Sequence, residues 1–203
     1  MALATGIGAG AALALLHHAE TSGITSAAAL PVETWAADTR PAPAFTLTDQ
    51  DGKAVSLAGL GGRPVIVTFL DPLCRNFCPR EASVISEAVK RLGADDPAIV
   101  AVSVDPWGDT RQSFREDALH WRLASQWQWA TGTAAQLAAV WRSYEVGVTV
   151  TTSSIAGVTL REITHTAATY LVDPSGHMRA LLLYPFTPAE LVRAMHVMLT
   201  TSD

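Results

Sequence analysis

The two cysteines of this 203-residue chain, Cys74 and Cys78, stand four residues apart at the end of an apolar run. That run, Val65 to Leu70, is short, rich in β-branched residues and bounded by prolines, which is typical of a buried strand. Beyond Cys78 the apolar residues recur with helical spacing, so a helix is expected to begin near Pro79. Cys74 then lies in a strand-to-helix turn and Cys78 at the positive end of the helix, where the macrodipole favours a thiolate.

Two cysteines at this spacing lie about one helical turn apart, close enough to form a disulfide or to share one soft ion. The pair therefore predicts redox or metal chemistry, and the alternative is two small side chains that fill the core. A metal needs further ligands, and thiolates with an imidazole suit copper or zinc. A structural zinc site needs a fourth ligand, and the sequence offers no further Cys or well-placed His, so two sulfurs and one nitrogen favour copper, as Cu(I) or Cu(II).

The elements that must position this pair follow one another as hairpin, strand, helix, strand, two helices, strand hairpin and helix. The first hairpin is expected around Asp51-Gly52, a second buried strand over 98–104, and helix caps at Thr133 and Thr187. A parallel strand pair extended by an antiparallel hairpin predicts an α/β, thioredoxin-like fold, with a central mixed sheet flanked by helices and an N-terminal β-hairpin extension. In such sheets ligands bind beyond the carboxyl ends of the strands, where Cys74 falls.

His165 is the predicted third ligand. It follows a long Thr-, Ser- and Gly-rich segment, 146–164, which predicts either a functional loop or an irregular hairpin. It also directly precedes a predicted central strand, and in a thioredoxin-like sheet that junction faces the first strand-to-helix turn. The other histidines are expected in the N-terminal segment, on helices or in a turn: His17, His18, His120, His196 and His177.

We expect one domain over 44–203, preceded by a hydrophobic segment over 1–20 and a flexible tether over 21–43. Residues 2–16 carry no charge and have the length of a signal h-region, too short to cross a hydrocarbon core of ~30 Å unaided. They predict a signal or an atypical, truncated membrane anchor, and the alternative is a disordered Ala/Gly-rich tail. The net charge of −5 and the few basic residues argue against a nucleic-acid partner.

Three separated motifs carry a family resemblance that spans about 45–199. They are TFLDPLCRNFCP at 68–79, VSVDP at 102–106 with Asp109-Thr110, and His165 ahead of TYLVDPSG at 169–176. In this order they resemble the Sco/SenC family of copper-binding, thioredoxin-like proteins. The resemblance implies one copper ion held by Cys74, Cys78 and His165, in a domain tethered to a membrane outside the cytoplasm.

The resemblance also implies a role in assembling the dinuclear copper centre of cytochrome c oxidase, as metallochaperone, thiol reductant or both. The expected partner is the copper-accepting subunit of that oxidase or another copper protein. The expected location is extracytoplasmic, either anchored to the plasma membrane or secreted. In a reductant, Cys74 and Cys78 are the redox-active pair, so thiol-disulfide reductase activity accompanies or replaces copper delivery.

The sequence departs from the family pattern at Arg75-Asn76-Phe77, where Pro-Asp and an aliphatic residue are usual, and at Gly108, where Arg is usual. A cation beside the sulfurs is expected to favour thiolates but to weaken the attraction for a metal cation. Two other functions compete. A thiol peroxidase of the peroxiredoxin type fits Cys-Pro-x-Glu, but Arg75 stands where a hydroxyl is wanted. A thioredoxin-class oxidoreductase favours two residues between the cysteines and a proline near position 165.

Overall fold

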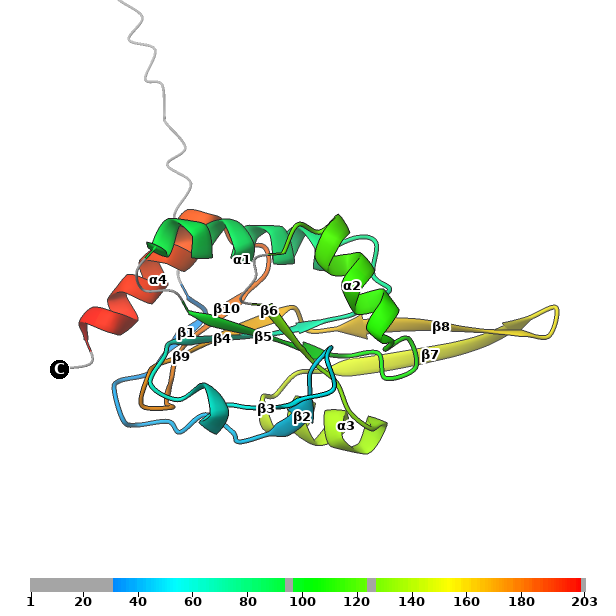
Figure 1. The fold of residues 1–203 in the computed structure, drawn as a ribbon, viewed down its shortest axis with the longest axis horizontal. Helices are drawn as coiled ribbons and strands as arrows, with labels where there is room; N and C mark the ends of the chain where they lie inside the picture. Colours follow the sequence, from blue (N-terminus) through cyan, green and yellow to red (C-terminus); the bar gives the residue numbers. More distant parts are fainter. Residues whose placement is uncertain (1–30, 94–96, 124–126, 202–203) are drawn as a thin grey trace, which may run out of the picture.

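A computed structural model describes residues 31–93, 97–123 and 127–201. The predicted hydrophobic segment 1–20, the first part of the predicted tether and His17 and His18 lie outside these residues. The domain is built on a six-stranded sheet in the order β1-β10-β9-β4-β5-β6 (Figure 1). Its strands are β1 Glu33–Thr34, β4 Val65–Leu70, β5 Ala98–Ser103, β6 Trp127–Ala130, β9 Ala168–Val172 and β10 Met178–Leu183.

Helices cover both faces of this sheet, as the thioredoxin-like prediction requires. One face carries α1 Cys78–Leu92, α2 Arg111–His120 and α4 Pro188–Thr200 (Figure 1). The other carries α3 Ala134–Ser143, the hairpin of β2 Thr46–Thr48 and β3 Ala54–Ser56, and the 3-10 turn Ala58–Leu60. The predicted N-terminal hairpin and the caps at Thr133 and Thr187 are confirmed.

The central strand β4 explains why its sequence is apolar throughout. It pairs in parallel with β5 and antiparallel with β9, and all six of its residues are buried. Ile66 packs into the cluster that includes Ile85 of α1, whereas Val67 packs into the opposite cluster with Tyr144. A strand buried on both faces loses the alternation of apolar and polar residues that marks a half-exposed strand. The turn after β4 therefore leaves the sheet from a rigid, fully packed support.

The N-terminal arm, 32–41, lies along the outer edge of β10. Strand β1 pairs antiparallel with β10, and the backbone N–H of Val32 donates to the Leu181 carbonyl at 2.8 Å. Pro41 forms a further bridge with His177. The second half of the segment predicted as a flexible tether is therefore part of the domain. Short alternating strands at a sheet edge carry little sequence signal, which is why this pairing was not predicted.

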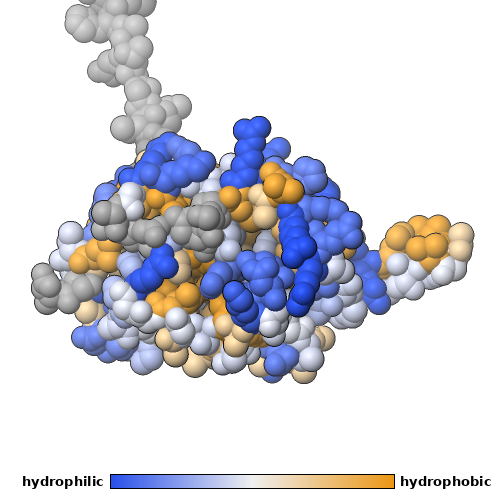
Figure 2. All heavy atoms as spheres, viewed as in Figure 1, coloured by the Kyte–Doolittle hydropathy of each residue, from blue (hydrophilic) through white to orange (hydrophobic). Residues whose placement is uncertain are grey.

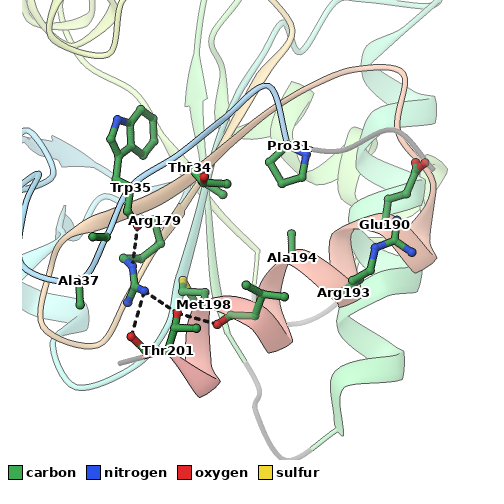
Figure 3. Close-up of a pocket in the computed structure, with 13 residues that line it drawn as sticks. Pro31, Thr34, Trp35, Ala37, Arg179, Glu190, Arg193, Ala194, Met198 and Thr201 are labelled. Carbon is green, nitrogen blue, oxygen red and sulfur yellow. Dashed lines mark hydrogen bonds between the residues drawn. The ribbon is translucent and has the colours of Figure 1, made fainter. Parts of the chain in front are cut away.

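A buried ion pair fastens this arm and the end of α4 to the sheet. Arg179 Nη1 lies 3.3 Å from Asp173 Oδ2, and both side chains are almost fully buried. The same guanidinium donates to the Trp35 carbonyl and, at 2.7 Å, to the Thr201 hydroxyl (Figure 3). The groove beside it, between α4 and the arm, encloses about 530 Å³ and is lined by no cysteine or histidine among the described residues.

Two parts of the chain differ from the sequence prediction. Residues 127–130 form β6, a strand of four residues with two buried tryptophans, which was not predicted from the sequence. Residues 146–164 contain a regular hairpin, β7 Val148–Ile155 and β8 Val158–His165, rather than a loop or an irregular hairpin. The hairpin projects beyond the domain, and its tip is apolar (Figures 1 and 2). None of the described helices is long and apolar enough to span a membrane.

Candidate metal centre

The turn between β4 and α1 holds both cysteines where the sequence predicts them. Asp71 opens the turn: its carboxylate accepts the Leu73 N–H at 2.7 Å, and its carbonyl accepts the Cys74 N–H at 3.1 Å. Cys74 is partly exposed, whereas Cys78 is the first residue of α1 and is buried. The Cys78 N–H points at the Cys74 sulfur, 3.4 Å away. The helix start therefore presents its free N–H to Cys74.

This arrangement shifts the pKa values of the two thiols in opposite directions. The hydrogen bond from the Cys78 thiol, together with nearby backbone N–H groups, lowers the pKa of Cys74 to about 5. The same hydrogen bond and burial raise the pKa of Cys78 well above its usual range. The prediction of a thiolate at Cys78 is therefore wrong for the metal-free protein. The helix terminus does favour an anion, but the anion it stabilises is the Cys74 sulfur.

The difference in pKa between Cys74 and Cys78 predicts that one of them is alkylated selectively. In the metal-free, reduced protein, iodoacetamide is expected to modify Cys74 first, at a rate that rises through a midpoint near pH 5, because only the thiolate is nucleophilic. Cys78→Ala removes the donated hydrogen bond and is expected to move that midpoint to higher pH. Mass spectrometry of alkylated peptides over pH 4–9 measures both. Faster labelling of Cys78 than of Cys74 would contradict the assignment.

His165 ends β8, and its ring reaches the buried cysteine. Its Nε2 lies 3.7 Å from the Cys78 sulfur, and its Nδ1 lies 3.2 Å from the Thr166 carbonyl. A carbonyl can only accept, so Nδ1 carries the proton and Nε2 has a free lone pair. Burial lowers the pKa of His165, which keeps the ring neutral. The imidazole is therefore in the tautomer that a metal ion would bind through Nε2.

The two cysteines and His165 line one cavity of about 730 Å³. Its wall also contains Glu81, a fully buried residue that the sequence did not single out as part of the site. Glu81 Oε1 accepts hydrogen bonds from Thr68 and Thr169, and its Oε2 has no partner among the described residues. Burial raises its pKa to about 7. The only available signal was its place one turn after Cys78.

The departures from the family pattern have a structural explanation. The Arg75 guanidinium does not face the sulfurs: its Nη1 donates to the carbonyls of Pro72 and Cys74 and lies 3.7 Å from Asp117 of α2. The expected effect of this cation on the sulfurs is therefore small, and Arg75 is not one of the main causes that lower the pKa of Cys74. At Gly108 a Cβ would meet the Asp105 carboxylate and the Leu73 side chain, so a larger residue there would require these two side chains to move.

No three His, Cys, Asp or Glu side chains of the described residues already stand in a complete metal-binding arrangement. The donor set nevertheless fits a soft ion: two sulfurs in one turn and a neutral imidazole on the same cavity wall. The remaining described histidines lie elsewhere, because His120 and His196 are exposed on helices and His177 contacts Asp38. The structure thus brings together the three predicted ligands and no other described histidine.

A thioredoxin-like domain with a free cysteine pair after its first central strand, faced by a histidine from a hairpin, defines the class of this protein. The chain matches the family described as SCO1/SenC over residues 35–200, and it belongs to that family. The predicted resemblance is therefore confirmed.

Relatives and solved structures agree with this assignment. The chain is 33% identical over 91 residues to the SCO1 protein homolog of Bacillus subtilis, covering 43% of this chain and 47% of that one. The structure of Bradyrhizobium japonicum ScoI with copper bound has a TM-score of 0.67 and 28% sequence identity, and the match covers 77% of this chain and 98% of that chain. Peroxiredoxin Q of Oryza sativa subsp. japonica is 33% identical over 82 residues, 40% of this chain and 36% of that one. The chain thus spans about half or less of the curated relatives it matches.

Proposed function

We propose that this chain binds one copper ion through Cys74, Cys78 and His165 and serves as a copper metallochaperone, a thiol reductant or both. Its target is the dinuclear copper centre of cytochrome c oxidase, through the copper-accepting subunit or another copper protein. We place it outside the cytoplasm, anchored to the plasma membrane or secreted. The oxidase target and the location rest on membership of the SCO1/SenC family, whereas the copper site rests on the cavity.

The observation that carries the copper site is the separation of Cys78 and His165. Ligands with bond lengths typical of zinc sites, about 2.3 Å for sulfur and 2.0 Å for nitrogen, stand roughly 3.5–3.7 Å apart when they share one ion. The Cys78 sulfur and His165 Nε2 are 3.7 Å apart. Two donors held at this distance, with a second sulfur one helical turn away, need little rearrangement to hold a soft cation.

Each residue has a definite part in this function. Cys74, partly exposed and with a low pKa, is the group that an incoming partner reaches first. Cys78 and His165 lie deeper and hold the other side of the site. Copper, when bound, supplies the cargo to be transferred. As a reductant, the Cys74 thiolate attacks a partner disulfide and Cys78 then displaces the partner's thiol, leaving a Cys74–Cys78 disulfide and two reduced thiols.

A Cu(I) titration tests the proposal. The reduced domain, in anaerobic competition with a chromogenic chelator, is expected to bind one Cu(I) per chain. His165→Ala should weaken binding without abolishing it, because two thiolates alone can hold Cu(I). His196→Ala, an exposed histidine on α4, is the control and should bind as the wild type does. The absence of stoichiometric binding by the wild type would overturn the proposal.

A thiol peroxidase is the second candidate, supported by the partial match to peroxiredoxin Q. The raised pKa of Cys78 weighs against it, because the cysteine that attacks peroxide must be a thiolate. Arg75, three residues before Cys78, donates to carbonyls and leaves no hydroxyl at that place. Rapid, copper-independent peroxide turnover that requires Cys78 would favour this reading.

A further inference from the structure

The residue that follows Cys74 ties the cysteine turn to a neighbouring helix. Arg75 Nη1 donates to the carbonyls of Pro72 and Cys74, each at 3.1 Å, and lies 3.7 Å from Asp117 Oδ1. Both of its hydrogen-bond acceptors belong to the turn, and its ion-pair partner belongs to α2. A single guanidinium therefore joins the backbone on either side of Leu73 to a different element of the fold.

Asp117 has the properties of an anchor for this contact. Only 5% of its side chain is exposed, and its Oδ2 has no hydrogen-bond partner among the described residues. A buried carboxylate is costly unless a cation is close. Arg75 is the only basic side chain of the described residues within 4 Å of it. The Arg75 side chain is 66% exposed, so solvent screens the pair from the arginine side.

The rest of the turn has few other restraints. Asp71 holds its start through the N–H groups of Leu73 and Cys74. Among the described residues, Asn76 and Phe77 form no side-chain hydrogen bond or ion pair, and 63% of Phe77 is exposed. Between Cys74 and Cys78, only Arg75 links its side chain to another element.

We propose that Arg75, paired with Asp117, is a positioning residue that holds Cys74 beside Cys78 in the metal-free protein. This positioning role adds a residue to the proposed copper site and rests on the proposed copper function. A ligand that is already ordered loses less conformational freedom when it binds an ion. Arg75 therefore raises Cu(I) affinity by holding the backbone of Cys74, although its charge repels the cation.

Four variants distinguish this positioning role from a purely electrostatic effect. If only charge mattered, Arg75→Ala would strengthen Cu(I) binding and Asp117→Asn would weaken it. If the contact positions Cys74, both variants weaken binding by about tenfold, and the double variant is no weaker than Arg75→Ala alone. Arg75→Lys keeps a cation with three donors and is expected to recover most of the loss. Arg91→Ala, which breaks the exposed pair with Glu87 on α1, is the matched control and should change nothing.

Hydrogen exchange of the copper-free protein gives an independent measurement. The Cys74 and Cys78 amides, both hydrogen-bonded within the turn, should exchange several-fold faster in Arg75→Ala and Asp117→Asn than in the wild type or Arg91→Ala. Unchanged exchange, or tighter Cu(I) binding by Arg75→Ala, overturns the positioning role. If the wild type binds no Cu(I), the copper function fails, and exchange alone decides whether Arg75 holds the turn.

Discussion

Cys78→Ser is expected to lower the Cu(I) affinity of the reduced domain by at least about 100-fold, which corresponds to roughly 2.8 kcal/mol. The substitution exchanges a soft sulfur for a hard hydroxyl oxygen, which Cu(I) binds poorly. It also leaves Cys74 and His165 as the remaining donors, with the buried sulfur lost. Anaerobic chelator competition measures the affinity.

Serine is close in volume to cysteine, so the variant is expected to fold, and circular dichroism checks this. Cys74→Ser should cause a loss of similar size, because Cys74 supplies the only other thiolate. Ser83→Ala, at an exposed position on α1, is the control and should bind as the wild type does. Cu(I) binding that survives in both cysteine variants would place the copper elsewhere and contradict the proposed site.

Arg179→Ala is expected to lower the free energy of unfolding by about 3–5 kcal/mol, the range found when one partner of a buried ion pair is removed. It leaves the Asp173 carboxylate buried without its cation, and it also frees the Trp35 carbonyl and Thr201. The N-terminal arm and the end of α4 then lose the hydrogen bonds that both make with Arg179. Chemical denaturation followed by tryptophan fluorescence measures the loss.

The double variant Arg179→Ala/Asp173→Asn isolates the cause. Neutralising Asp173 removes the unpaired charge, while the asparagine oxygen can still accept the hydrogen bonds from Ser175 and His177. The double variant should therefore be more stable than Arg179→Ala alone. Arg193→Ala, at an exposed position of α4, is the control and should cost less than about 0.5 kcal/mol. A loss that small for Arg179→Ala would mean that the ion pair contributes little.

The parts of the fold that the sequence predicted are those with strong local signals. The buried strand before the cysteines and the helix from Cys78 were predicted because an unbroken apolar run gave way to helical spacing. The cap at Thr187 was predicted because Pro188 and Glu190 follow it, and the cap at Thr133 because it precedes apolar residues with helical spacing. Strands β1 and β6 were missed because two and four residues are too few to show a period.

Some features of the candidate site were likewise predicted from the sequence, and others were not. His165 was predicted from topology, since the junction before a central strand faces the first strand-to-helix turn, and the 3.7 Å contact with Cys78 agrees. The ionisation of the pair was not predicted correctly, because it depends on which sulfur is buried and which accepts the hydrogen bond. The direction of Arg75 was also inaccessible, because nothing near it in sequence indicates that its partner is Asp117, 42 residues further along the chain.

The two-residue strand β1 determines where a recombinant fragment of this domain should begin. It covers the outer edge of β10, whose backbone groups would otherwise be open to a strand from another molecule. Uncovered sheet edges are templates for association between chains. A recombinant fragment that starts at residue 44, the boundary the sequence indicates, would lack this cover and would be prone to self-association. A fragment that starts at or before Pro31 keeps the edge closed.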